Sequence, residues 1–146
     1  MSAQPTSRTR EQPQGDEEAS TELKLGEFQG VPTLTLSEAR LLINAVLDHR
    51  STSGREFPET EMLRSTQDYL DVFARFKQKE NIEAVERLLS TLTDLESFER
   101  SQLGSLCCET AEEAKTLIPS LAGKIPDQDL QDLLDEITRL RSFVDQ

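Results

Sequence analysis

The sequence lacks tryptophan, and aromatic residues make up only 5% of its 146 residues. A core built from this composition is expected to be small and mostly aliphatic. No run of about 18 apolar residues is present, so no segment is predicted to span a membrane. The first 20 residues have no apolar stretch of the kind that a secretory signal needs, so a reducing, intracellular setting is expected.

Residues that bind metals or carry out redox chemistry are scarce. The one histidine, His49, is expected near the C-terminal end of a helix, where its charge suits the helix dipole. Cys107 and Cys108 are adjacent, and neighbouring helical side chains point about 100° apart, so the pair is poorly placed to hold one ion. Burial in a core is the favoured interpretation for both cysteines, with a metal or redox role as the alternative. Neither a GxGxxG nor a Walker sequence is present, so the sequence predicts no catalytic residue, no metal and no cofactor.

Positive charge is in the minority. Sixteen Lys and Arg residues stand against 28 Asp and Glu residues, which gives a formal net charge of -12. A field of this sign repels nucleic acid phosphates and anionic membranes, so contact with nucleic acid is expected to be indirect. The alternative function is a free-standing nucleic-acid-binding domain, whose candidate basic patch consists of Arg75, Lys77, Lys79 and Arg87.

Helical periodicity is what the sequence does contain, and it predicts an all-α fold of about six helices. The first helix, over 36–50, follows a capping box formed by Thr35 and Glu38. Further helices are predicted over 60–79, 81–92, 94–106, 110–118 and 127–144, with Asn81, Thr110 and Asp127 as N-caps. The clearest apolar face belongs to the helix over 60–79 and is formed by Met62, Thr66, Tyr69, Leu70, Phe73 and Phe76.

The segment before the helices has a different character. Residues 1–20 contain no Leu, Ile, Val or Phe and are predicted to be a disordered polar and acidic tail. Residues 23–28 and 31–36 are predicted to be short extended pieces, and no strand is predicted elsewhere that could pair with them. Residues 51–59 have a turn-rich composition and are predicted to be a linker.

Several blocks of sequence together resemble one known family. LKLGEF and LTLSEARLLI come first, followed by VFARFK (72–77), FERSQLGSLCCETAEEAKTLIPSL (98–121) and LQDLLDEITRLRSF (130–143). In this order they are similar to the smaller stalk subunit of eukaryotic RNA polymerase II, its fourth subunit, which has a counterpart in the stalk of archaeal RNA polymerase. The resemblance covers residues 23–146, and GSLCC is most similar to fungal members. One departure is Ser97, where the family often has a basic residue.

This resemblance implies a fold and a set of partners. It implies a helical bundle like the HRDC domains of RecQ-type helicases over residues 60–146, and a partner-binding arm with the first helix over 21–50. It also implies a non-catalytic polymerase subunit in the nucleus, with cytoplasmic shuttling left open, that pairs with the larger stalk subunit, the seventh. Further implied partners are the polymerase core, initiation factors and RNA-processing factors.

The resemblance also suggests which residues contact the larger stalk subunit. The extended pieces of the arm are expected to add short strands to a sheet of this partner. The residues expected at the contact are Leu23, Leu25, Phe28, Leu34, Leu36, Leu42 and Val46.

Overall fold

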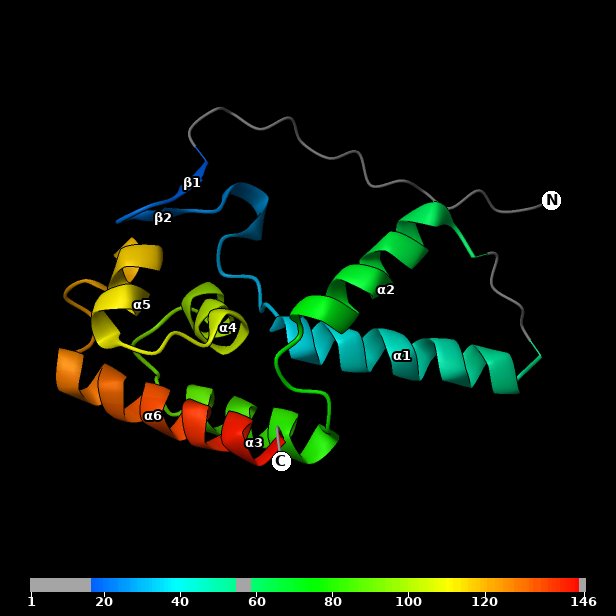
Figure 1. Ribbon diagram of the computed structural model, residues 1–146. Coiled ribbons are helices and arrows are strands. Elements are labelled where there is room, and N and C mark those ends of the chain that lie inside the picture. Colours follow the sequence, from blue (N-terminus) through cyan, green and yellow to red (C-terminus); the bar gives the residue numbers. More distant parts are fainter. Residues whose placement is uncertain (1–16, 55–58, 145–146) are drawn as a thin grey trace.

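The computed structural model describes residues 17–54 and 59–144, which are mostly helical (Figure 1). A two-stranded antiparallel hairpin, β1 (Glu18–Ala19) and β2 (Leu23–Lys24), is followed by the 3-10 helix η1 (Gly26–Phe28). The remaining elements are α1 (Leu36–Thr52), α2 (Glu61–Phe73), α3 (Lys79–Ser90), α4 (Ser97–Leu106), α5 (Ala111–Leu117), the 3-10 helix η2 (Pro119–Leu121) and α6 (Asp127–Val144). The predicted all-α class is confirmed, with short strands near the N-terminal end of the described residues.

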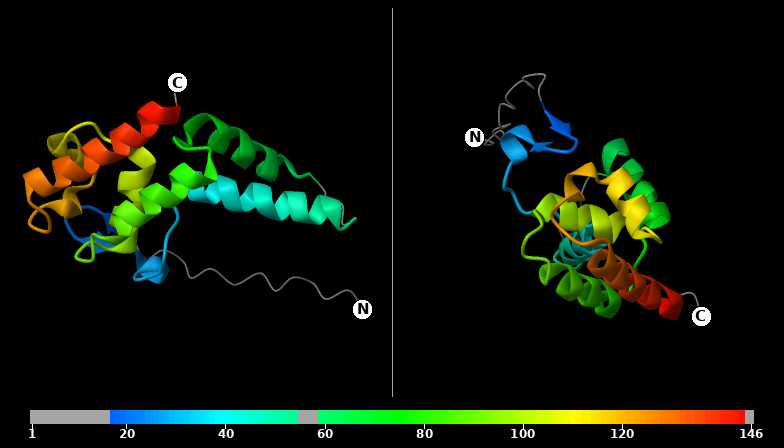
Figure 2. Two further views of the ribbon diagram at one scale, coloured as in Figure 1. Left: turned by 90° about the horizontal axis from the view of Figure 1, so that it is seen from below. Right: turned by 90° about the vertical axis from the view of Figure 1, so that its left-hand side faces the viewer.

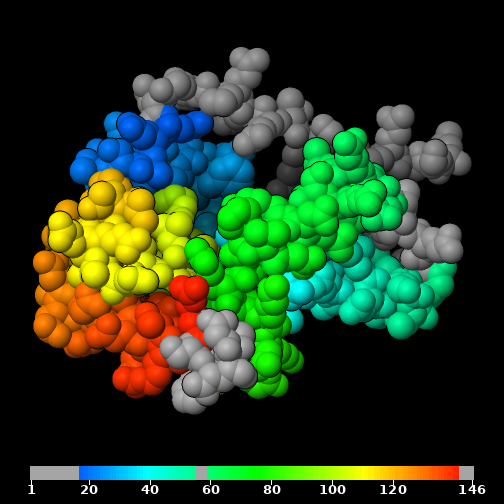
Figure 3. Space-filling view, in the orientation of Figure 1, coloured from blue at the N-terminus to red at the C-terminus, as the bar shows by residue number. Residues whose placement is uncertain are grey.

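The described helices form two parts, a compact bundle and a projecting hairpin. Helices α3 to α6 form a compact bundle, while α1 and α2 form an antiparallel helical hairpin that projects from its side (Figures 1 and 2). Both helices of this projection are open to solvent on the face shown in Figure 3. Of the helices that the structure describes, none combines the length and apolar character that crossing a bilayer requires.

The hydrophobic core lies in the compact bundle. It runs from Phe76 to Ile137, and Leu41 of α1 packs against it from outside. By contrast, α1 has no fully buried apolar residue, and α2 has only Leu70. The α1–α2 projection is therefore held by one helix–helix interface and a few contacts with the bundle, which leaves much of its apolar surface uncovered.

The predicted capping boxes explain where two helices begin. At α1, the Thr35 hydroxyl accepts the backbone N–H of Glu38, and the Glu38 carboxylate accepts that of Thr35, both at 3.1 Å. At α5, the Thr110 hydroxyl accepts the N–H of Glu113 at 3.1 Å. The Glu113 carboxylate accepts the N–H of Glu109 and not that of Thr110, so only the Thr110 half of the second predicted capping box forms.

The helix predicted over 60–79 is too long. It ends at Phe73, and Ala74 is already extended. Phe76, expected on the same helix face, leaves the helix and is 1% exposed in the bundle core, where its N–H donates to the Ser37 hydroxyl at 3.1 Å. Burial of this ring and the new hydrogen bond outweigh the local preference to continue the helix. Four residues expected on the inner face are instead exposed: Met62, Thr66, Tyr69 and Phe73.

Other expectations at element ends also need correction. Helix α3 begins at Lys79, and its N-cap is Gln78, three residues before the predicted N-cap Asn81. Asp127 is the first residue of α6 and not its N-cap, because the Pro126 carbonyl accepts the first helical N–H, from Leu130.

The segment before α1 also differs from the prediction. Leu23–Lys24 does find a partner within the chain, since it pairs with Glu18–Ala19. The chain reverses direction between these two segments, which brings their peptide groups together. The sequence has no apolar pattern there that would predict this pairing. Residues 1–16 of the predicted tail, and 55–58 of the predicted linker, lie outside the described residues.

Candidate partner-binding surface

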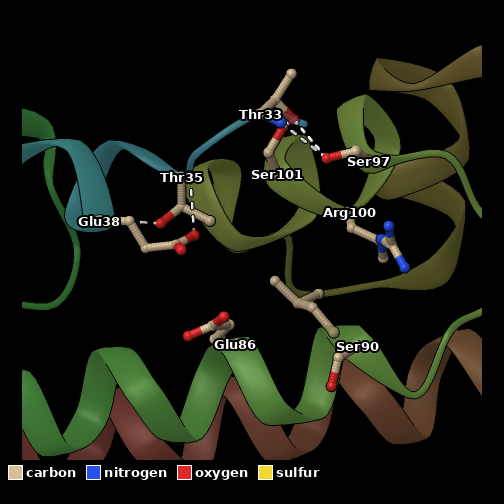
Figure 4. Close-up of a pocket in the computed structure, with 9 residues that line it drawn as sticks. Thr33, Thr35, Glu38, Glu86, Ser90, Ser97, Arg100 and Ser101 are labelled. Atoms are coloured by element: carbon tan, nitrogen blue, oxygen red, sulfur yellow. Dashed lines mark hydrogen bonds between the residues drawn. The ribbon is translucent and has the colours of Figure 1, made fainter. Parts of the chain in front are cut away.

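The N-terminal arm, residues 17–35, is fastened to α4 by a row of serines. The Thr33 N–H donates to the Ser97 hydroxyl at 2.8 Å, and the Thr33 hydroxyl donates to Ser101 at 2.8 Å. One helical turn further on, Ser105 accepts the N–H of Leu36 at 3.0 Å. Serines four residues apart lie on one helix face, so this serine row holds an extended chain along α4 (Figure 4).

Gly104 makes this close approach sterically allowed. A Cβ atom at position 104 would lie 2.6 Å from Cγ2 of Thr35 and 2.9 Å from Cδ1 of Leu89. The sequence analysis missed this docking site for the arm. The available signal was three serines at a spacing of four residues with a glycine beside the last of them, in SFERSQLGS.

Helix α1 follows directly after the arm, and its apolar residues extend around most of the helix. Arg40 faces α2, where it pairs with Asp71 at 2.9 Å, and Ile43 and Leu47 share that side by helical spacing. Leu41 packs toward the bundle. Leu42 and Val46, one helical turn apart, are exposed, Leu42 at 55%. A helix that is apolar on most sides is typical of one buried in an assembly.

The seven residues predicted to contact the partner divide into two groups. Four are exposed and available to a partner: Phe28 and Leu34 on the arm, and Leu42 and Val46 on α1. The other three, Leu23, Leu25 and Leu36, are half-buried. The exposed members, together with Val31, define what we call the arm–α1 surface.

A groove lies beside this surface, between α1 and α3. Its volume is about 410 Å³. We call its apolar lining residues the floor of the groove and its charged lining residues the rim. The floor comprises Leu34, Leu41, Leu42, Ala45 and Ile82, and the rim comprises Glu38, Lys79, Glu83 and Glu86.

A smaller polar cavity of about 190 Å³ adjoins the groove (Figure 4). Glu38 from α1 and Glu86 from α3 project toward the same space, and both also line the groove. The serine row forms the opposite wall with Ser97 and Ser101.

The four residues of the predicted basic patch lie on α3 and on the connection before it. Arg75 and Lys77 lie on the connection between α2 and α3, and the Lys77 ammonium donates to the Asp71 carbonyl at 2.9 Å. Lys79 and Arg87 lie on α3, where Lys79 is 3.9 Å from Glu83. The role of these four residues in binding nucleic acid stays a prediction.

The two cysteines are core residues, as predicted. Cys107 ends α4 in the left-handed conformation with φ of 50°, and its thiol donates to the Gly104 carbonyl at 3.3 Å. Burial raises the pKa of the Cys107 thiol from 9.0 to about 11, and burial also raises the pKa of Cys108. Both thiols are therefore protonated at neutral pH, which is the opposite of what a nucleophile or metal ligand requires. Within the part of the chain that the structure describes, no three His, Cys, Asp or Glu residues cluster as metal ligands would.

A buried carboxylate not anticipated from the sequence links α4 to the segment before α6. Glu99 is 0% exposed, and it accepts hydrogen bonds from the Glu96 N–H and the Lys124 ammonium at 2.8 Å and from the Ser120 hydroxyl at 2.6 Å. Three donors satisfy the charge, so this group stabilises the bundle.

Comparison with known proteins agrees with the resemblance found in the sequence. A family model described as RNA polymerase Rpb4 matches residues 33–141. The chain is 53% identical over 132 residues to DNA-directed RNA polymerase II subunit rpb4 of Schizosaccharomyces pombe, which covers 88% of this chain and 96% of that protein. It is 50% identical over 98 residues to the RPB4 subunit of Saccharomyces cerevisiae (67% of this chain, 42% of that protein). It is 37% identical over 131 residues to the rpb4 subunit of Dictyostelium discoideum (74% and 83%). The chain therefore belongs to the RNA polymerase Rpb4 family.

Proposed function

We propose that this chain is a non-catalytic subunit of nuclear RNA polymerase II and forms the stalk with the larger stalk subunit. The family assignment supports the polymerase and its nuclear setting. The observation that carries the pairing is the exposure of two apolar side chains on α1, Leu42 and Val46. Burying one such aliphatic side chain contributes about 1.5–3 kcal/mol, so the exposed side chains of this helix offer substantial binding energy.

The arm extends the proposed contact beyond α1. The serine row of α4 holds residues 33–36, and this positions Leu34 next to Leu42 of α1. Further along the arm, the β1–β2 hairpin consists of two strands of two residues each. Such a short hairpin is not stable by itself, and a partner sheet that adds to its edge would extend it.

The remaining proposed partners are basic proteins that assist initiation or process RNA. The net charge of -12 favours basic protein surfaces over phosphate. The alternative of a free-standing nucleic-acid-binding domain has less support, since a net charge of -12 repels phosphate.

Affinity of the full-length chain for the larger stalk subunit of the same species tests the pairing. Leu42→Ala is expected to weaken binding about tenfold or more, because a buried leucine loses its contacts. Leu117→Ala on α5 is the matched control, since Leu117 is 54% exposed against 55% for Leu42. Equal losses for the two variants, or no complex with the unmodified chain, would refute the proposed interface.

A further inference from the structure

The groove between α1 and α3 has an unusual combination of floor and rim. Its floor includes Leu42 of the arm–α1 surface and Ile82, which packs into the bundle core. Its rim carries three carboxylates, from Glu38, Glu83 and Glu86, and one ammonium, from Lys79. These groups give the rim a formal charge of -2.

The rim charges are only partly neutralised within the described residues. Lys79 lies 3.9 Å from Glu83, a long distance for a surface ion pair. Glu38 accepts the Thr35 N–H as part of its capping box and has no cationic partner there. A partner that covered this groove with neutral atoms alone would remove water from the carboxylates without replacing it, which is costly.

The adjoining polar cavity offers room for a cationic side chain. Glu38 and Glu86 line both the groove and the cavity, so a side chain that passes between them would meet two carboxylates (Figure 4). Ser97, Ser101 and the guanidinium of Arg100 also line the cavity, and both hydroxyls already accept hydrogen bonds from Thr33. The groups that would attract a basic side chain entering from the groove are therefore the carboxylates of Glu38 and Glu86. An apolar side chain could therefore occupy the groove while a neighbouring long basic side chain occupies the polar cavity.

We propose that the groove receives a segment of the larger stalk subunit in which an apolar side chain lies beside a lysine or arginine. The apolar side chain covers Leu42 and Ile82, and the basic one pairs with Glu86 and Glu38. This inference rests on the proposed function, because it specifies the chemistry by which the same partner is recognised at the edge of the arm–α1 surface.

Affinity for the larger stalk subunit, measured with the full-length chain at low and high salt, tests the inference. The test variant is the double substitution Glu83→Gln and Glu86→Gln, which leaves the Glu38 capping box intact. Its affinity is expected to fall about tenfold at low salt, mainly through slower association, and this deficit is expected to shrink at high salt. The matched control is Glu112→Gln with Asp129→Asn, two exposed acids on α5 and α6, which makes the same change in net charge away from the groove.

The possible results separate the two proposals. A salt-sensitive loss in the groove variant alone supports the inference. Equal affinities for the groove variant and the unmodified chain, with a loss in Leu42→Ala, overturn the inference and leave the proposed pairing intact. A similar loss in the groove variant and its control overturns the inference too, since it shows a general effect of charge. Absence of any complex with the unmodified chain overturns both.

Discussion

The two adjacent cysteines occupy different local environments, although both are buried. The Cys107 thiol donates to the Gly104 carbonyl and sits at the left-handed end of α4. Cys108 packs in the apolar cluster, where no carbonyl partner for its thiol is found among the described residues. A serine hydroxyl at position 107 inherits an acceptor, whereas one at position 108 does not.

We therefore expect Cys108→Ser to be the more destabilising of the two substitutions. It should lower the free energy of unfolding by about 1–3 kcal/mol, the cost of burying a hydroxyl without a partner, and Cys107→Ser should cost less. Urea denaturation of both variants at neutral pH measures the difference. Equal costs would show that the Gly104 carbonyl does not discriminate between them.

The raised pKa of Cys107 also gives this residue a pH dependence. A folded-state pKa of about 11 against 9.0 means that folding favours the neutral thiol. Its contribution to stability is complete below pH 9 and is lost as the pH rises through 11.

Glu99 is the residue whose removal should harm the bundle most directly. In Glu99→Ala the Lys124 ammonium, the Ser120 hydroxyl and the Glu96 N–H all lose their acceptor. We expect a loss of about 3–5 kcal/mol in the free energy of unfolding, as when one partner of a buried ion pair is removed. Glu112→Ala, an exposed acid on α5, is the control in the same urea titration and should change stability by less than about 0.5 kcal/mol. A small effect at Glu99 would mean that water replaces the carboxylate.

At the scale of elements, the contact between the arm and α4 depends on one absent side chain. Gly104→Ala would improve the helix propensity of α4 by about 1 kcal/mol, but its Cβ would overlap Thr35 and Leu89. We expect the arm to be displaced, with faster hydrogen exchange at the Thr33 and Leu36 amides that the serine row now holds. Gln102→Ala, about 200° around the same helix, is the control for helix propensity. Unchanged exchange at both amides in Gly104→Ala would show that the arm docks independently of this position.

The elements also show what the sequence could predict. The Thr35–Glu38 and Thr110–Glu113 patterns predicted two helix starts correctly, because capping is decided by residues three apart. The end of α2 was missed, because it depends on burying Phe76 and on the distant Ser37 hydroxyl. Pairing of β1 with β2 was missed because strands of two residues carry no readable periodicity.

The candidate surface was predictable to a similar extent. Helical spacing alone could not show whether Leu42 and Val46 face α2, the bundle or solvent. Their proposed role came from the resemblance. Their exposure became clear only once α2 and the bundle had covered the other sides. The groove was not predictable, because it joins Leu34 and Leu42 to Ile82, which lies on another helix.

At the scale of the whole molecule, net charge governs contact with nucleic acid. The isolated chain should not bind single-stranded RNA measurably at physiological salt, because its net charge of -12 opposes counterion release. Arg75→Glu with Lys77→Glu should therefore leave a gel-shift assay unchanged. A salt-dependent complex that these substitutions abolish would restore the nucleic-acid-binding alternative.

Buried apolar contacts are distributed unevenly over the molecule. The bundle has its own core, while the α1–α2 projection has one fully buried apolar residue in its two helices, Leu70. An excess of the larger stalk subunit at about 100 times its dissociation constant should stabilise the chain by about 2.7 kcal/mol. For a chain of this size that corresponds to a rise of about 5–10 °C in melting temperature.

The same titration can show where the stabilisation arises. Hydrogen exchange should slow in α1 and in the arm, while amides in α5 and α6, which carry none of the residues of the arm–α1 surface, should exchange as before. Protection concentrated in α6, or an unchanged melting temperature at saturating partner, would contradict the pairing through α1. Protection of α1 alone, without the arm, would retain the helix contact and remove the arm from the interface.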